Sequence, residues 1–297
     1  MRSSTPAFST SGPGPRRRPG RASGWCRRDP IACGAAAFLC VLAGLALLPG
    51  AVTGYAYDQQ DLRHPFQPPG SGHALGTDQY GRDVLSRLLF GARVSLSVGL
   101  SAVAIEALLG LACGTAAGFY RGRVDAVLMR AVDVLIAFPT LLLAILVTGI
   151  FGPSLVNLVI ALVLTAAPGT ARTIRSAVLA LREREFIESA RSLGASTLRI
   201  LARHLVPNVV NLLLARATLD VSILILAEAT LSFIGIGVQP PRPSWGLMIS
   251  DSFQYLGGQP QLVIIPAAAL SLTVAALNLV GESLAGRSPA VPRYVLR

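Results

Sequence analysis

The acidic residues that lie inside apolar runs are the side chains best placed to do chemistry in this sequence. They are Glu106, Asp133, Asp220 and Glu228. A carboxylate is costly in hydrocarbon, so such a residue usually faces a protein interior or a water-filled cavity, and a functional role is expected by default. Asp133 and Asp220 each have an arginine within one helical turn, and local pairing with it is an equal alternative. Glu228 has none, which favours a functional role for it.

The sequence gives little support to a catalytic site or a metal site built from other residue types. All 26 basic residues are arginine, so the chain has no lysine for Schiff-base catalysis or for a phosphate-binding loop ending in Gly-Lys. The scattered histidines His64, His73 and His204 do not form a metal-ligand pattern. We therefore expect no catalytic residue, no metal site and no cofactor site in this chain.

The composition is that of a membrane protein. Hydrophobic residues make up 52% of the 297 positions and charged residues only 14%, against about 25% in an average soluble domain. The net charge of +11 could indicate a nucleic-acid partner, but the arginines lie between apolar blocks instead of gathering in one stretch. We therefore expect contact with membrane lipid and none with nucleic acid.

Six apolar blocks are long enough to cross a bilayer, which takes about 20 helical residues. They lie at about 31–52, 94–118, 126–150, 153–171, 208–231 and 262–284. The blocks predict an all-α membrane protein with six transmembrane helices and with both termini on the same side. Pro139 and Pro168 fall inside two of the blocks, where we expect them to kink the helices.

The arginines indicate which side the termini occupy, because short cytosolic loops are enriched in basic residues. With the N-terminus in the cytosol, the cytosolic segments hold twenty arginines and the outer segments hold four. The sequence therefore predicts that both termini are cytosolic.

This topology divides the chain into a transmembrane domain over 29–285, a disordered basic tail over 1–28 and a short cytosolic tail over 286–297. The domain has one long cytosolic loop at 172–207 and two outer loops at 53–92 and 232–261. The apolar spacing of Val84, Leu85, Leu88 and Leu89 predicts a short helix along the outer membrane interface. Trp245 is of a type that sits at the headgroup boundary.

The cytosolic loop contains the stretch "EFIESARSLGAS" at 185–196. A helix over 182–193 would carry Phe186, Ile187, Ala190 and Leu193 on one stripe, and Gly194 suits the left-handed turn that ends it. Ser196 or Thr197 can cap a second short helix, which Pro207 would close. A solvated connector is the alternative, but an apolar stripe beside small residues favours a docking element.

The stretch "EFIESARSLGASTLRILARHLVPN" resembles the cytoplasmic loop signature of binding-protein-dependent ABC importer permeases. Glu188, Ser189 and Ala190 fill the EAA positions of that signature, Gly194 follows after three residues, and Pro207 closes it. Ser189 replaces the usual alanine. "LGTDQYGRDVLSRLLFGARVSL", "VDVLIAFPTLLLAI", "ILAEATLSFIGIGVQPPRPSWG" and "LNLVGESL" resemble the C-type permease subunit of dipeptide and oligopeptide importers.

The resemblance implies the type I importer fold and a non-catalytic, multi-pass subunit of the bacterial inner membrane. It implies one half of a heterodimeric pore, with a second permease subunit, two ATP-binding subunits that hold ATP and Mg, and an extracytoplasmic solute-binding protein. The loop would couple to the ATPase through six residues: Glu188, Ser189, Ala190, Leu193, Gly194 and Pro207. Asp133, Asp220 and Glu228 are the candidates for the translocation path or a subunit contact.

Two alternatives stay open. Nickel permeases share this family, and His64 and His73 lie in one predicted outer loop, so the substrate could be nickel or another solute instead of a peptide. A self-sufficient secondary transporter would show matching repeated halves and clustered ionisable groups at mid-membrane, and neither is evident in the sequence. A membrane-embedded enzyme would need a catalytic constellation, and none stands out.

The predicted topology can be tested by labelling. A cysteine placed at Ser192 should react with a membrane-impermeant thiol reagent only after the cells are opened, because the loop faces the cytosol. A cysteine in the 53–92 loop should react in intact cells. Labelling of the Ser192 position from outside would refute the orientation.

Overall fold

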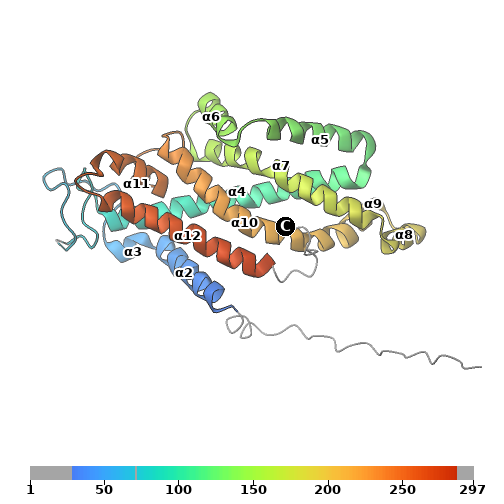
Figure 1. Ribbon diagram of the computed structural model, residues 1–297, viewed down its shortest axis with the longest axis horizontal. Coiled ribbons are helices and arrows are strands. Elements are labelled where there is room, and N and C mark those ends of the chain that lie inside the picture. The colour runs from blue at the N-terminus through green and yellow to red at the C-terminus, as the bar shows by residue number, and fades with distance from the viewer. Residues whose placement is uncertain (1–28, 71, 286–297) are drawn as a thin grey trace, which may run out of the picture.

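The computed structural model describes residues 29–70 and 72–285, so the two predicted tails lie outside the described residues. The described part is built of helices and holds no strand, apart from an isolated bridge between Thr77 and Asp83. Four long helices run side by side (Figure 1): α4 (Val84–Tyr120), α7 (Leu155–Arg182), α10 (Val206–Phe233) and α12 (Gln261–Ala285). The predicted all-α fold is confirmed.

Five helical stretches in the described residues are long and apolar enough to cross a membrane. They are α2 (Pro30–Leu47), α4, α7, the continuous Thr197–Phe233 and α12. The third predicted span, 126–150, is instead divided into α5 (Gly122–Ala137) and α6 (Thr140–Phe151), which meet at 94°. Six spans result only if this bent pair is counted as one.

The bend of α5 and α6 follows from Pro139. The residue before a proline is pushed toward extended backbone, and Phe138 has φ −84° and ψ 133°. Pro139 thus stops the helix more sharply than the predicted kink. Pro168 behaves differently, because α7 continues through it as one helix.

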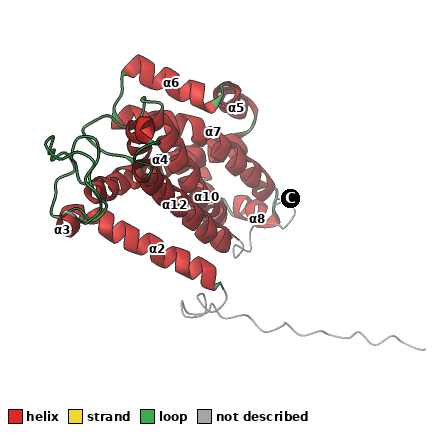
Figure 2. Cartoon of the chain, turned by 60° about the vertical axis from the view of Figure 1, so that its left-hand side comes forward, coloured by secondary structure: helices red, strands yellow, loops and turns green. Residues whose placement is uncertain are grey.

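The remaining helices cover opposite sides of the long ones. The α2 helix packs on α12 and α4, whereas α5 packs on α4 and α7, and α6 packs mainly on α7. The second view shows α2 on one side of the bundle and α5 and α6 on the other (Figure 2). A short helix, α3 (Pro49–Thr53), follows α2 and leads into the first outer loop.

The closest helix contact joins α4 to α7. Three glycines one turn apart face α7, and a β-carbon at any of them would overlap an atom of that helix. At Gly114 it would lie 2.4 Å from the Ala171 carbonyl oxygen, and at Gly118 it would lie 2.9 Å from that of Arg175. Small residues at this spacing let two membrane helices approach until their backbones touch.

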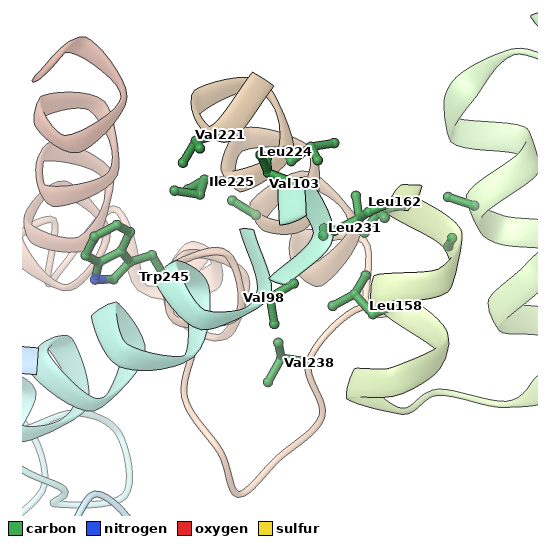
Figure 3. Packing of buried hydrophobic residues seen from close by; sticks show 14 of the residues in the cluster. Val98, Val103, Leu158, Leu162, Val221, Leu224, Ile225, Leu231, Val238 and Trp245 are labelled. Atoms are coloured by element: carbon green, nitrogen blue, oxygen red, sulfur yellow. The ribbon is translucent and has the colours of Figure 1, made fainter. Parts of the chain in front are cut away.

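The main core lies between α4, α7 and α10. Val98 and Val103 of α4 meet Leu158 and Leu162 of α7, and Ile225 of α10 packs beside them (Figure 3). A β-carbon at Gly99 would lie 2.4 Å from the side chain of Ile225, so α10 is also held close to α4. The core therefore binds three of the long helices into one unit.

Trp245 also belongs to this core, at the start of α11 (Trp245–Ser252). Only 1% of the residue is exposed, and its Nε1 donates a hydrogen bond to the Leu88 carbonyl at 3.1 Å. Trp245 is therefore packed inside the protein and not at the lipid headgroups, the position that its residue type predicts. A β-carbon at position 246 would lie 2.1 Å from the Ala229 carbonyl oxygen, so only glycine lets α11 pack this close to α10. This close packing brings the neighbouring indole into the core.

The predicted interface helix around Val84–Leu89 is also wrong, because these residues form the first turns of α4. Asp83 caps that helix, its carboxylate accepting a hydrogen bond from the Ser86 amide at 2.6 Å. The buried Arg87 would be unfavourable there alone, but its Nη2 lies 3.6 Å from an Asp251 carboxylate oxygen on α11. The outer loops thus cover and neutralise the start of the span.

The two predicted outer loops meet at one end of the bundle, where the rings of Phe66 and Tyr255 lie 5.1 Å apart. The predicted cytosolic loop lies at the opposite end, beside the label α8 in Figure 1. The long helices therefore separate the two sets of loops, as the arginine distribution predicts.

The glycine contact gives a stability prediction. Gly114→Val should lower the thermal midpoint of the detergent-purified chain, because overpacking a tight contact costs roughly 1–3 kcal/mol or more. Gly44→Val in α2 is the matched control, since a β-carbon there meets no atom within 4 Å. Equal midpoints for the two variants, measured by thermal unfolding, would contradict the proposed role of this contact.

Candidate functional site

The cytosolic loop forms a helical hairpin (residues 185–205) that projects beyond the bundle (Figure 1). Its first arm is α8 (Glu185–Ser192), and its second is α9 (Thr197–Ile200) followed by the π-helical turn η2 (Leu201–Leu205). The first arm begins three residues later than the predicted helix over 182–193. Glu183 and Arg184 separate it from α7, with Arg184 in an extended conformation.

The turn between the arms has the predicted geometry. Gly194 has φ +78°, a region that favours glycine, and its amide donates to the Arg191 carbonyl at 2.9 Å. The Ala195 amide donates to the Ala190 carbonyl at 3.0 Å, which completes a Schellman motif. Ser196 caps the second arm by accepting a hydrogen bond from the Arg199 amide at 3.4 Å. The predicted left-handed turn and the serine cap are both confirmed.

Pro207 does not end the second short helix, contrary to the prediction. It lies in the first turn of α10, and the chain from Thr197 to Phe233 is one continuous helical path. Because the helix is continuous here, Pro207 interrupts its hydrogen-bond pattern, since it cannot donate to the carbonyl one turn before it. The π-helical turn over 201–205 directly precedes it, and such turns are the local adjustment found where the regular pattern is disturbed. The second arm of the hairpin is therefore a direct extension of a membrane helix.

The inner side of the hairpin is fixed to the cytosolic ends of α4 and α7. Ile187, Ile200 and Leu205 are 0–2% exposed and share an apolar cluster with Phe119 of α4 and Val178 of α7. Burying each such side chain stabilises the contact by about 1.5–3 kcal/mol. The hairpin is therefore packed firmly on the membrane helices beneath it.

Arginines reinforce this contact. Arg182 donates to the Phe119 carbonyl, and the guanidinium groups of Arg182 and Arg191 each lie 5.6 Å from the centre of the Phe119 ring. Cation–π contacts at such distances contribute about 0.5–1 kcal/mol when exposed. One phenylalanine at the end of α4 thus holds the end of α7 and the first arm of the hairpin.

The outer side of the hairpin presents large apolar side chains to water. Leu193 is 87% exposed and Leu198 is 76% exposed, with Phe186 partly exposed beside them. Glu188 and Ser189 are exposed on α8, while Ala190 is half-buried. The single predicted stripe is thus divided, because Ile187 points inward and Leu193 outward. Large exposed apolar side chains are therefore present on both arms of the hairpin.

The acidic residues of the spans occupy three different settings. Glu228 is fully buried and accepts hydrogen bonds from Ser95 and Ser232 at 2.8 and 2.7 Å. Asp133 is exposed and pairs with Arg172 of α7 at 2.6 Å, instead of with Arg130. Asp220 pairs with Arg216 at 3.1 Å, the local pair that the sequence offered.

The structure joins Asp220 to a wider polar network that spacing along the chain could not predict. Arg216 also donates to Thr170 Oγ1 of α7 at 2.9 Å, and Thr170 donates to the buried Glu106 of α4 at 3.2 Å. Three helices therefore contribute to one network within the membrane domain. Glu228 does not belong to it, and contributes instead to the contact between α4 and α10.

The histidines of the outer loop do not come together. His73 Nδ1 lies 2.9 Å from an Asp83 carboxylate oxygen, and His64 Nδ1 lies 2.9 Å from one of Asp61. The hydrogen bond from His64 lowers the pKa of Asp61. Over the described residues, no group of three or more His, Cys, Asp or Glu side chains could hold a metal ion.

Comparison with known proteins identifies relatives over most of the chain. The family described as "binding-protein-dependent transport system inner membrane component" matches residues 108–288. A putative peptide transport system permease protein of Brucella suis is 41% identical over 258 residues, covering 87% of this chain and 86% of the relative. A glutathione transport system permease protein of Escherichia coli is 40% identical over 259 residues, covering 87% and 86%.

A dipeptide transport system permease protein of Alkalihalophilus pseudofirmus is 38% identical over 240 residues, covering 81% of this chain and 79% of the relative. Among solved structures, an inward-facing conformation of the MetNI methionine ABC transporter has a TM-score of 0.57 at 20% identity. The match covers 69% of this chain and 96% of that one. It shows that the two chains share a fold, which confirms the predicted importer architecture.

The buried side of the hairpin gives a further prediction. Ile187→Ala should loosen α8, because removing a buried isoleucine costs roughly 2–5 kcal/mol. Hydrogen exchange of the α8 amides in the purified chain should become faster. Leu193→Ala is the matched control, because that side chain is 87% exposed and its loss should leave exchange unchanged. Equal exchange in the two variants would contradict the two-sided description of the hairpin.

Proposed function

Because the chain belongs to the family of binding-protein-dependent transport system inner membrane components, we propose that it imports peptides as one half of a heterodimeric pore. The family is one of permease subunits, so the chain is a multi-pass protein of the inner membrane and the permease component of an ABC importer. The proposal adds the substrate, the composition of the complex and the site at which ATP hydrolysis is coupled to transport.

The two-sided hairpin is the observation that carries the coupling proposal. An ATPase subunit would bind the outer side, where Leu193 and Leu198 are exposed to water. The inner side would transmit its displacement, because Ile187 is buried against the ends of two membrane helices. ATP and Mg would be bound by the two ATPase subunits, which fits the absence of lysine from this sequence.

Each proposed coupling residue has a distinct part in this scheme. Glu188, which is exposed near the start of α8, would pair with a basic group of the ATPase. Ser189 and Ala190 are small and would let the partner backbone approach closely. Gly194 sets the angle between the arms, and Pro207 lies where the second arm joins α10.

The second permease subunit would bind across the membrane-exposed surface of the bundle, and the solute-binding protein would dock on the outer loops. Peptides are the proposed substrate because relatives at 38–41% identity are named as peptide, dipeptide and glutathione permeases. The separate pairing of His64 and His73 with aspartates gives no support to a nickel substrate.

The turn of the hairpin provides the test of coupling. Gly194→Val should reduce ATP-dependent peptide uptake by at least about tenfold, while the chain still inserts into the membrane. A left-handed conformation costs an L-residue roughly 1–2 kcal/mol, so the turn must reorganise in this variant. Uptake and ATPase stimulation should be measured on the reconstituted importer with its binding protein.

Gly54→Val is the matched control for this experiment. Gly54 is left-handed, with φ +69° and ψ −2°, and a β-carbon there, as at Gly194, meets no atom within 4 Å, but it lies at the end of α3 before the first outer loop. It should bear the same backbone strain without uncoupling. Glu188→Arg should also uncouple, through repulsion of the basic partner group. Uptake at the wild-type rate by both Gly194→Val and Glu188→Arg would refute the coupling proposal.

A further inference from the structure

Arg216 is a partly exposed cation inside a membrane-spanning helix. It lies ten positions after the start of α10, or about 15 Å along the helix axis from its cytosolic end. The side chain is 36% exposed. A charged group at this depth is too costly to face hydrocarbon, so its exposed edge must face water or another protein chain.

The surface around Arg216 is polar as well. On the adjacent α7, Arg172 is 50% exposed and pairs with Asp133 of α5, which is 57% exposed. Thr173, next to Arg172 in the sequence, accepts a hydrogen bond from Arg216 Nη1 at 3.4 Å. Polar side chains of α5, α7 and α10 are therefore exposed in this part of the bundle. In a pore built from two permease subunits, the place that supplies water at this depth is the path between them.

The guanidinium group is held rigidly by one of its edges. Its Nε donates to Thr170 Oγ1 at 2.9 Å and lies 3.1 Å from Asp220 Oδ2. Asp220 is 11% exposed at the side chain, and it fixes the group from the α10 side. An arginine that is oriented in advance loses less conformational freedom when it binds an anion, and its planar fork matches a carboxylate.

The Nη2 nitrogen of Arg216 is the open one. Nη1 donates to Thr173, whereas within the described part of the chain Nη2 has no hydrogen-bond partner. Gly169 of α7 lies beside it, and a β-carbon at that position would be 3.0 Å from Nη2. The glycine thus leaves room next to the free nitrogen. Asp220 pairs with the Nε side of the guanidinium and reduces its positive charge, so a bound anion would be held weakly and released again.

We propose that the Nη2 edge of Arg216 binds the terminal carboxylate of the transported peptide as it crosses the membrane. This inference rests on the proposed function, since it assigns a peptide group to a residue of the proposed path. Every unmodified peptide carries this carboxylate, whatever its side chains. A fixed cation would therefore lower the cost of moving that charge through the pore without selecting among sequences.

The test compares one dipeptide with its C-terminal amide. The reconstituted importer should be supplied with binding protein saturated by either compound, and the uptake rates compared. Arg216→Gln should reduce uptake of the free dipeptide by about tenfold or more and that of the amide by no more than about twofold, because only the former loses a charge-assisted hydrogen bond. Arg216→Lys keeps the charge without the planar fork, so it should retain more uptake of the free dipeptide than Arg216→Gln.

Arg175→Gln is the matched control. Arg175 is also on α7 and in a partly buried ion pair, with Asp125 at 2.5 Å, but it is not on the proposed binding edge. It should affect the two compounds equally. Equal losses for both compounds in Arg216→Gln, or wild-type uptake of the free dipeptide, would overturn the inference.

Two further outcomes are decisive. If the binding protein does not deliver the amide, the test compares uptake of the free dipeptide by Arg216→Lys and by Arg216→Gln. Equal uptake by these two variants would refute the inference. If the wild-type complex takes up neither compound, the proposed peptide substrate has failed, and that failure is distinct from any effect at Arg216.

Discussion

The contact between α4 and α7 is the constraint on which the rest of the structure depends. Their backbones approach so closely at Gly114 and Gly118 that no β-carbon fits between them. The cytosolic ends of the two helices are therefore held side by side, and Phe119 and Val178 form one apolar surface there. The hairpin binds to this surface. A change in the spacing of α4 and α7 would displace the candidate coupling site itself.

This arrangement connects a cytosolic surface to the membrane helices in two ways. One arm of the hairpin is buried against α4 and α7, and the other continues through a π-turn into α10. The α10 helix is in turn tied to α4 by Glu228, whose carboxylate accepts hydrogen bonds from both helices. Because interfaces of this kind have discrete packed states, a push on the hairpin is expected to move these helices together and not to bend one alone.

Local sequence rules predicted the features that local interactions determine. Gly194 and Ser196 form the turn and the cap that their residue types favour, and the apolar blocks locate the long helices. Tertiary contacts decided other features that these rules did not predict. Trp245 is buried because glycines let α11 approach the core. The helix that begins at Val84 continues into the span because Arg87 forms an ion pair with Asp251, which is distant in the sequence. The link from Arg216 to Thr170 has the same origin and left no signal in the sequence.

The exposed leucines of the hairpin have a consequence for the synthesis of the protein. A chain that has reached the membrane without its cytosolic partners displays Leu193 and Leu198 to water, and such surfaces are where aggregation begins and where quality-control proteases engage. A partner bound as proposed would cover both leucines, so an assembled chain would withhold from these proteases the surface that a lone chain offers them.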